Sequence, residues 1–414
     1  MLVLKAKYLL TDPYNIIENG AVLIDDGKIT FAGCFKDVNK HDSNRIIDFA
    51  NSAIVPGLIN THTHLELTNL HKCINYNGDF TDWIRQIVDA KKNWGVHDYK
   101  SSIHEGIKRS LESGTTTVAD ITRNGLAIDE LKKSKIRKTL FYELIDFNPD
   151  SAERTIENFK EKLTYIKEDN LFTLGIFPHA PYTVSKELYK LCSLVSDELN
   201  INIATHISET NDEIEFLTRG TGRFMSLLRD YDMLNNWKYP GLRPINYLND
   251  IGILENGCIL IHCNYISEEE IDDIKTSHSS IVFCPRSHNY FCHENHPFCK
   301  FIENDINVAL GTDSLASNDS LSILDEMRFL YENHKDIKPQ DILYMGTIAG
   351  AIALGLKDKV GRLESGFDAD ITVLKLPEER AGNIYDRIFS QDSECIFTVV
   401  SGSVCYDNYT VNQE

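Results

Sequence analysis

The chain has 414 residues, of which 42% are hydrophobic and 25% charged, and its formal net charge is −20. This composition is typical of a globular protein with a large core, and the acidic balance disfavours binding to the phosphate backbone of nucleic acids. No segment offers about 18 uncharged apolar residues in a row, so we expect no membrane span.

The N-terminus has no charged region followed by a long apolar run, so it does not resemble a signal peptide. Ten cysteines occur without a Cys-x-x-Cys pair. Several of them lie in apolar surroundings, which is typical of small buried side chains in a reduced compartment. We therefore expect a cytoplasmic protein.

Both ends of the chain show strand patterns. Residues 20–33, GAVLIDDGKITFAG, have two apolar runs around an Asp-Asp-Gly turn, which predicts a hairpin. Near the C-terminus, residues 366–376 and 396–406 are also β-rich, and Ser401-Gly402 divides the second run.

The middle of the chain alternates between short apolar runs and longer helical patterns, and residues 218–250 are predicted to be a helix and an insertion before the sixth strand. Eight strand-then-helix units predict a parallel (β/α)8 TIM barrel. A doubly wound open sheet alternates in the same way, but the polar residues of interest fall at strand C-terminal ends, which a barrel gathers around one site. The eight runs are residues 53–62, 115–121, 137–145, 171–180, 201–207, 258–263, 280–285 and 307–313.

Two histidines stand at the end of the first run: His62 is its last residue, and His64 follows two positions later. Side chains at i and i+2 share one face of a strand, so both imidazoles point into the same site. His206, His262 and Asp313 end three other runs. Each alone is more often structural, but together they would converge at the barrel mouth. Three or four ligands with an open position form a catalytic metal site.

These motifs resemble those of the amidohydrolase superfamily. PGLINTHTH, THISET, LIHCNYIS and LGTDSLASNDSL are similar to its motifs on strands one, five, six and eight. Residues 360–374, VGRLESGFDADITVL, resemble the segment where such chains leave the barrel. The resemblance covers essentially the whole chain. It implies a metal-dependent barrel over residues 55–365 and a small β-sandwich domain built from residues 1–54 and 366–414.

Two features resemble the mononuclear deaminase and chlorohydrolase branch. Binuclear members carry a bridging lysine at the end of strand four, where this chain reads FPHAPYT. The sequence HISE resembles the motif that carries the proton shuttle of this branch. The resemblance implies one divalent metal per chain, zinc or alternatively iron, and the implied ligands are His62, His64, His206 and Asp313.

The same resemblance implies catalytic roles. Metal coordination lowers the pKa of water towards about 7. Asp313 would accept a proton from that water, and His262 would hold the attacking oxygen. Glu209 would protonate the ring nitrogen beside the attacked carbon. A solvated surface charge is the alternative for Glu209.

Three residues near the predicted mouth are candidate substrate contacts. His179 lies in PHAPYTVS, which resembles the strand-four motif of S-adenosylhomocysteine/methylthioadenosine deaminases, where the histidine contacts the nucleoside. Trp83 in FTDWI would cover a flat base or pack a lid helix. Glu66 would bond a polar group of the ligand or a backbone amide.

Three further candidates follow other strands. Arg123 and Arg286 would bind a carboxylate or a ribose hydroxyl, although surface arginines are commoner. His288 stands in CPRSHNYF, where many relatives carry Asn. It belongs to residues 284–299, which hold three Cys and three His. Their spacing matches no standard zinc pattern, so a substrate loop is favoured over a second zinc site.

We therefore expect a metal-dependent hydrolytic deaminase that converts a 6-aminopurine nucleoside to its 6-oxo product and ammonia. HTHLEL, FTDWI and CPRSHNYF resemble aminodeoxyfutalosine deaminases, which serve menaquinone synthesis. The alternatives are deamination of S-adenosylhomocysteine, methylthioadenosine, adenosine or guanine, and triazine dechlorination. A non-catalytic scaffold is disfavoured because every implied ligand is present. The expected partner is a small-molecule nucleoside, and relatives of this kind are often homo-oligomers.

Overall fold

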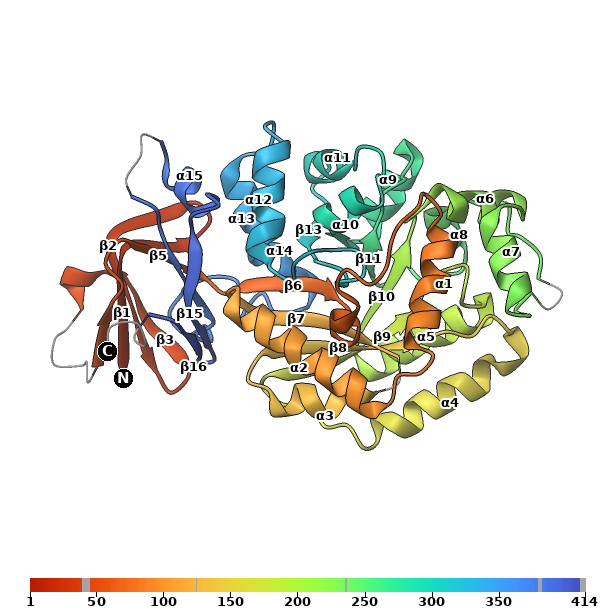
Figure 1. The fold of residues 1–414 in the computed structure, drawn as a ribbon, viewed down its shortest axis with the longest axis horizontal. Coiled ribbons are helices and arrows are strands. Elements are labelled where there is room, and N and C mark those ends of the chain that lie inside the picture. The colour runs from red at the N-terminus through yellow and green to blue at the C-terminus, as the bar shows by residue number, and fades with distance from the viewer. Residues whose placement is uncertain (39–44, 124, 235–236, 379–381, 410–414) are drawn as a thin grey trace.

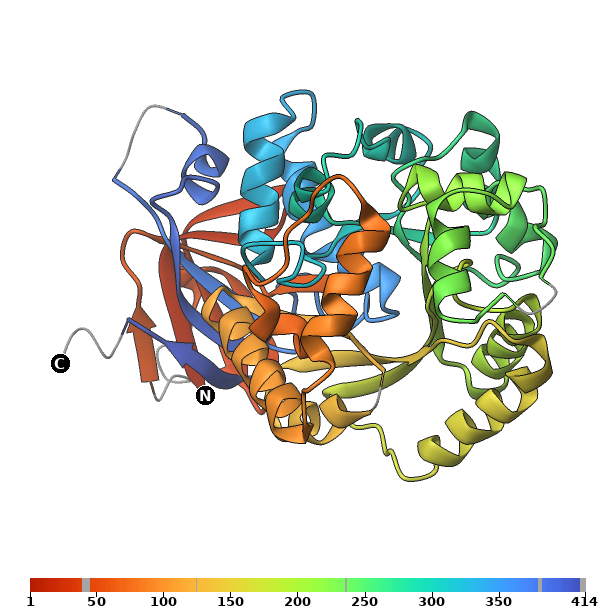
Figure 2. The same ribbon diagram turned by 45° about the vertical axis from the view of Figure 1, so that its right-hand side comes forward.

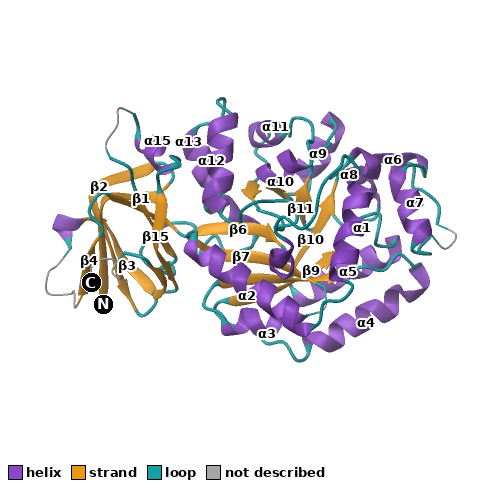
Figure 3. Cartoon of the chain, in the orientation of Figure 1, coloured by secondary structure: helices purple, strands orange, loops and turns teal. Residues whose placement is uncertain are grey.

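The computed structural model describes residues 1–38, 45–123, 125–234, 237–378 and 382–409, and two sheets form its framework (Figures 1 and 3). One sheet combines strands from both chain ends and contains both termini at the left of Figure 1. We call it the terminal sheet. Its order is β16-β15-β14-β5-β1-β2-β3, with β4 beside β1. Its strands are β1 (Leu2–Asp12), β2 (Asn15–Asp25), β3 (Lys28–Cys34), β4 (Arg45–Asp48), β5 (Ser52–Pro56), β14 (Ile371–Lys375), β15 (Glu394–Val400) and β16 (Ser403–Asp407).

Two tight hairpins of the terminal sheet follow the predicted turn chemistry. Asp26 and Gly27 join β2 to β3 with φ of 47° and 77°, and Ser401 and Gly402 join β15 to β16 with φ of 46° and 74°. Positive φ at both residues matches the twist of the flanking strands. The two turns also lie against each other, because a Cβ on Gly402 would stand 2.7 Å from the Cα of Gly27.

The second sheet is the predicted parallel barrel, in the order β13-β12-β11-β10-β9-β8-β7-β6. It closes where the Thr312 and Asp313 amides donate to the His62 carbonyl at 3.0 and 3.1 Å. Seven of the eight predicted strands are confirmed, the first is partly so, and the sheet is a barrel and not an open doubly wound sheet. The barrel strands are β6 (Leu58–Thr63), β7 (Thr115–Thr122), β8 (Arg137–Leu144), β9 (Phe172–Pro178), β10 (Asn202–Ile207), β11 (Ile259–His262), β12 (Ser280–Phe283) and β13 (Val308–Leu310).

One strand prediction was wrong. Residues 53–62 form two strands, because β5 belongs to the terminal sheet and β6 to the barrel. Gly57 separates them, and a Cβ there would stand 2.2 Å from Oγ1 of Thr116. The chain therefore passes from one sheet to the other within a single residue. The predicted domain boundaries remain a proposal.

Helices lie on the outer side of the barrel strands (Figures 1 and 2). The predicted Ser185 cap is confirmed, since its hydroxyl accepts the Leu188 amide. Among the described residues, no helix has both the length and the apolar character that a bilayer span requires. The helices are α1 (Phe80–Lys91), α2 (Val96–Glu112), α3 (Leu126–Lys133), α4 (Ala152–Leu163), α5 (Lys186–Leu199), α6 (Asn211–Arg219), α7 (Arg223–Asp230), α8 (Pro244–Asp250), α9 (Glu268–Thr276), α10 (Pro285–Tyr290), α11 (Phe298–Glu303), α12 (Ile323–Asn333), α13 (Pro339–Met345), α14 (Ile348–Ala353) and α15 (Ile384–Ile388), with 3-10 turns η1 (Phe35–Asp37), η3 (Leu65–Leu70) and η4 (Pro149–Ser151).

A buried ion pair joins the barrel to the terminal sheet. Arg137 begins β8 and is 2% exposed. Its Nε donates to Asp370 at 2.8 Å, and its Nη2 donates to Asp368 at 2.8 Å. Both carboxylates precede β14. Because buried charges need partners and hydrogen bonds, this cluster fixes the C-terminal strands against the base of the barrel.

Candidate active site

Histidines and an aspartate gather at the C-terminal ends of the barrel strands. In Figure 1, β6 points away from the terminal sheet, so this end of the barrel lies far from both termini. His62 is in β6 and His64 directly follows it, while His206 is in β10 and His262 ends β11. The side chain of His62 is fully buried. The topology thus brings together residues that are up to 251 positions apart, from His62 to Asp313.

The spacing of these atoms fits one metal ion. One ring nitrogen from each of His62, His64 and His206 lies within 4.8 Å of the others. Nε2 of His62 is 3.3 Å from Nε2 of His206 and 3.5 Å from Oδ1 of Asp313. Oδ1 is also 3.7 Å from Nε2 of His64. Ligand atoms about 2.1 Å from one ion at tetrahedral angles lie about 3.4 Å apart. Three imidazoles and a carboxylate suit zinc.

Burial favours the neutral form of His64 and His206, which is the form that binds a metal. Burial is the largest cause that lowers the pKa of His64 and His206 well below the ordinary value, and neighbouring histidines add to it. For Asp313, burial opposes ionisation, but the hydrogen bond from His62 and the attraction of the neighbouring histidines when they are protonated hold its pKa far below the usual range. The donor set is therefore poised to bind a cation.

The backbone is strained where these side chains project. Four residues have left-handed φ: Ser208 (51°), His262 (76°), Cys263 (53°) and Asp313 (57°). Such conformations cost about 1–3 kcal/mol for residues other than glycine and cluster at functional sites. The carbonyl of His262 is also fixed, because Nε2 of His296 lies 2.7 Å from it.

A buried acid lies beside the cluster. Oε1 of Glu209 is 3.4 Å from Nε2 of His262. Burial, followed by the charges of Asp313 and Glu213, raises the pKa of Glu209 well above its usual value. Burial therefore favours the protonated form of Glu209, which is the form that a general acid requires. Glu213 fixes this loop, because its carboxylate accepts the amides of Ser208 and Glu209 at 3.0 and 2.8 Å.

Two of the candidate substrate contacts lie close to the metal cluster. The ring of His179 is 5.0 Å from that of His206. Glu66, in η3, is 6% exposed. Burial raises its pKa, and the charges of Lys91 and Arg123 oppose this, which places Arg123 near the same corner of the mouth.

Glu143 was not among the predicted site residues, but it lies beside His179. It lies near the end of β8, is 9% exposed, and its Oε1 is 3.9 Å from Nε2 of His179. Burial, followed by repulsion from Glu66, raises the pKa of Glu143 to about 7. The available signal was a charged residue in RKTLFYEL, an otherwise apolar strand end next to the candidate site.

The other candidates lie further from the cluster. Trp83 is 8% exposed and packs on Phe80 and Phe291. Its Nε1 donates to the carbonyl of Ala316 at 3.3 Å. The guanidinium of Arg286 is 4.0 Å from Asp325 on α12.

Residues 284–299 do not form a second metal cluster. Over the ranges that the structure describes, only His62, His64 and His206 bring three potential ligand atoms within 4.8 Å. The three cysteines of the segment are free. His288 is partly buried, and its Nε2 has no hydrogen-bond partner among the described residues. The ring of His288 lies 5.6 Å from that of His296, which supports the His262 carbonyl.

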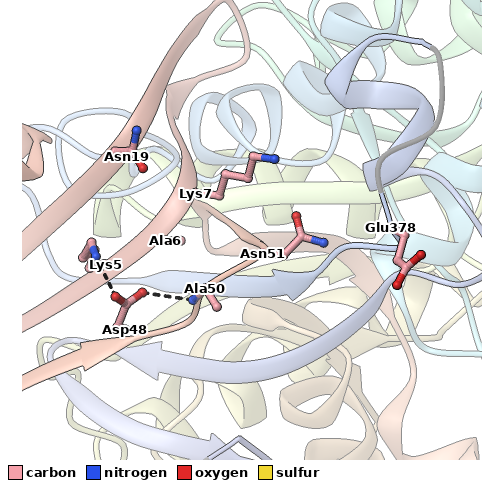
Figure 4. A pocket seen from close by; sticks show the side chains of 8 residues that line it. All are labelled: Lys5, Ala6, Lys7, Asn19, Asp48, Ala50, Asn51 and Glu378. Atoms are coloured by element: carbon pink, nitrogen blue, oxygen red, sulfur yellow. Dashed lines mark hydrogen bonds and ion pairs between the residues drawn. The ribbon is translucent and has the colours of Figure 1, made fainter.

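A surface hollow on the terminal sheet is separate from this site (Figure 4). It has a volume of about 650 Å³. Asp48 in its wall accepts hydrogen bonds from Nζ of Lys5 and the amide of Ala50. Its lining residues belong to β1, to neighbouring segments of the terminal sheet and to Glu378, not to the barrel mouth.

Comparison with known sequences agrees with the geometry. A protein 29% identical over 404 residues, named 5-methylthioadenosine/S-adenosylhomocysteine deaminase, occurs in Thermodesulfovibrio yellowstonii, and the match covers 93% of this chain and 87% of that protein. A 5'-deoxyadenosine deaminase from Methanobrevibacter smithii is 30% identical over 386 residues, with 88% and 82% covered.

Solved structures share the fold. An adenosine deaminase from Xanthomonas campestris with bound zinc has a TM-score of 0.86 at 22% identity, covering 98% of this chain and 93% of that chain. Helicobacter pylori aminofutalosine deaminase in complex with methylthio-coformycin has a TM-score of 0.85 at 23% identity, covering 98% and 100%.

The model of one protein family, described as the amidohydrolase family, matches residues 53–405. This range includes all eight barrel strands and the four residues of the cluster. The predicted resemblance and the predicted class of enzyme, an amidohydrolase, are confirmed. The chain belongs to the amidohydrolase family.

Proposed function

We propose that this protein hydrolyses 6-aminopurine nucleosides to their 6-oxo products and ammonia. The observation that carries the proposal is the position of Glu209, 3.4 Å from His262 and beside the histidine cluster. A buried, protonated acid at a metal site can protonate a ring nitrogen while water attacks the neighbouring carbon. The names of the two relatives, both deaminases of adenine nucleosides, support this choice.

We further propose that His62, His64, His206 and Asp313 hold one zinc ion per chain, with iron as the alternative. A bound divalent ion lowers the pKa of water to about 7 and so supplies a nucleophile at neutral pH. The zinc in the structural neighbour supports this metal.

Three side chains of the protein would then carry out the proton transfers and orient the water. Asp313 accepts a proton from the attacking water, and His262 orients the water oxygen towards C6 of the purine. Glu209 donates its proton to the adjacent ring nitrogen. The water oxygen remains on C6, and the proton from Glu209 stays on the ring nitrogen. One water proton passes through Asp313 to the departing amino group, which leaves as ammonia, and the other water proton returns to Glu209.

For the substrate, we propose an adenine nucleoside that is modified at its 5′ carbon, and we place aminodeoxyfutalosine first. The motifs HTHLEL, FTDWI and CPRSHNYF support it, together with the fold shared with aminofutalosine deaminase. Methylthioadenosine, S-adenosylhomocysteine and 5′-deoxyadenosine are the alternatives that the relatives' names support.

A substrate panel tests the proposal. Ammonia release and the ultraviolet change from a 6-amino to a 6-oxo purine are measured with aminodeoxyfutalosine, methylthioadenosine, S-adenosylhomocysteine, 5′-deoxyadenosine, adenosine, guanine and a chlorotriazine. We expect turnover of at least one 5′-modified adenine nucleoside. Turnover of guanine or the triazine alone would reject the proposal.

We also propose a cytoplasmic location and a homo-oligomeric state. All ten cysteines are free, which supports a reducing compartment. Light scattering of the purified protein tests the second point, and a monomer would contradict it.

A further inference from the structure

Two histidines of the Cys- and His-rich residues 284–299 reach the end of β11. Nε2 of His296 lies 2.7 Å from the carbonyl oxygen of His262. Nδ1 of His293 lies 3.1 Å from the hydroxyl oxygen of Tyr265. The loop that follows β12 is therefore tied at two points to residues 262–265, the segment that carries the imidazole next to Glu209.

The acceptor gives the direction of the first of these hydrogen bonds. A carbonyl oxygen cannot donate, so Nε2 of His296 carries the proton and donates it to His262. The His296 side chain is buried, and its ring stacks on that of Phe283, with centroids 3.8 Å apart and planes at 15°. The ring of Phe301 on α11 packs edge-on against it at 5.9 Å. Because these rings hold each other in a defined orientation, the N–H group of His296 has a fixed direction.

The backbone of His262 needs contacts of this kind. The pairing of β11 with β12 ends at Ile261, so His262 lies past the last pair of that ladder. The φ of His262 is 76° and that of Cys263 is 53°. Residues with a side chain keep such angles only where the surrounding structure enforces them. The His296 hydrogen bond does so on one side, and the Cys263 amide, which donates to the Ile207 carbonyl at 3.0 Å, does so on the other.

The backbone angle of His262 sets the direction of its ring. Nε2 of His262 is 3.4 Å from Oε1 of Glu209, and its ring centroid is 5.3 Å from that of His206 and 5.7 Å from that of His62. Rotation of the backbone towards an ordinary φ would turn the Cβ and carry the ring away from these neighbours. A misplacement of about 1 Å at a reacting group can cost about 10²-fold in rate.

We propose that His296 is a positioning residue for the deamination. Its Nε2–H group holds the His262 carbonyl and thereby keeps the His262 imidazole where it orients the attacking water. His293 supports the same segment through Tyr265. The loop of residues 284–299 therefore serves the reaction through hydrogen bonds to the end of β11. The inference rests on the proposed deaminase function, in which His262 orients the water.

Three variants at position 296 test the donor, with the panel substrate for which the wild type has the highest kcat/KM. His296→Leu removes the N–H group, His296→Gln restores one at a similar reach, and His296→Asn offers one that is a methylene shorter. We expect kcat to fall about 10²-fold in His296→Leu and His296→Asn, and His296→Gln to recover most of the loss. KM and metal content should stay near their wild-type values, because His262 acts on the water and not on the bound nucleoside or the metal.

A matched control separates positioning from stability. The buried Tyr385 hydroxyl donates to the carbonyl of Pro13 at the terminal sheet. Tyr385→Phe removes that donor, so it should lower the free energy of unfolding and leave kcat at the wild-type value. If His296→Leu does not fold, the kcat values of His296→Gln and His296→Asn decide the question, and equal values would overturn the role.

The outcomes separate the two proposals. A folded His296→Leu variant with wild-type kcat would overturn the positioning role and leave the deaminase standing. Equal losses of kcat in His296→Leu and His296→Gln would also overturn it, because the loss would then not follow the donor. If the wild type deaminates no adenine nucleoside of the panel, the deaminase function itself fails, and the role of His296 in it fails as well.

Discussion

The hydroxyl of Ser317 donates to Oδ2 of Asp313 at 2.6 Å, while Oδ1 of the same carboxylate faces His62 and His64. Ser287 donates to Oδ2 as well, at 2.9 Å. The two serines therefore hold one edge of the carboxylate and leave the other edge for a metal ion.

Removing this support should weaken metal binding. Partners that orient a metal ligand commonly contribute 10- to 100-fold in affinity, and we expect Ser317→Ala to lose about that factor. Competition with a chelator measures it. Ser320→Ala is the control, because Ser320 donates to Asp325 instead. Equal affinities for Ser317→Ala and the wild type would contradict the role.

Glu209→Gln should separate chemistry from metal binding. The amide keeps the shape of the side chain but cannot deliver a proton. We expect wild-type metal content and a fall in kcat of about 10²- to 10⁴-fold. Metal analysis and ammonia release on the same samples test this. A variant with near-normal kcat would remove Glu209 from the mechanism.

The metal content should be one ion per chain. Elemental analysis of the purified protein tests this, and two ions would refute the mononuclear site. Chelation should abolish turnover, and added zinc should restore it. His206→Ala should lose the ion. His278→Asn, at an exposed position with φ of 55° that Asn tolerates, should keep it.

The buried ion pair of Arg137 should affect stability more than chemistry. Arg137→Met leaves Asp368 and Asp370 without their buried partner, which typically costs about 3–5 kcal/mol. Denaturant unfolding measures the loss. Lys28→Met removes a half-exposed partner of Asp368 and should cost less than about 1 kcal/mol. Similar losses for the two variants would contradict this ranking.

Buried histidines should make the protein less stable in acid. Burial lowers the pKa of His288 to about 4 and that of His293 to about 3, whereas both protonate near pH 6.5 in the unfolded chain. Their contribution is therefore complete above pH 6.5 and is lost as the pH falls towards 4.

His288→Asn should reduce this pH dependence by up to one proton, or about 1.4 kcal/mol per pH unit. The free energy of unfolding between pH 7.5 and 5 gives the slope. An unchanged slope in His288→Asn would show that the pKa of His288 is not lowered in the folded protein.

The barrel strands and the convergence of His62, His64 and His206 could be predicted because they depend on local patterns. Apolar runs mark the strands, and a polar residue at a strand end must point into the mouth. Glu143 could not be recognised in this way, because its proximity to the site is defined by His179, which is 36 residues further along the chain. The division at Gly57 was also hidden, since the apolar run continues across it and both strands are buried.

The role of Trp83 could not be predicted, because its hydrogen-bond acceptor is far away in the sequence. Its indole could cover a base or pack a helix, and the acceptor that it uses, the Ala316 carbonyl, lies 233 residues away. Arg286 was ambiguous for a related reason. Its neighbour Asp325 is on α12, beyond the eighth strand.

The single-residue link at Gly57 has a consequence for synthesis on the ribosome. The strand that carries His62, β6, follows β5 after a single residue. On one side, β5 pairs with β14, and the ribosome synthesises β14 after all eight barrel strands. We therefore expect a nascent chain that has completed its barrel but not residues 371–375 to hold His62 and His64 loosely. Metal loading is then among the last events of its biogenesis, and chains truncated before β14 should emerge without metal.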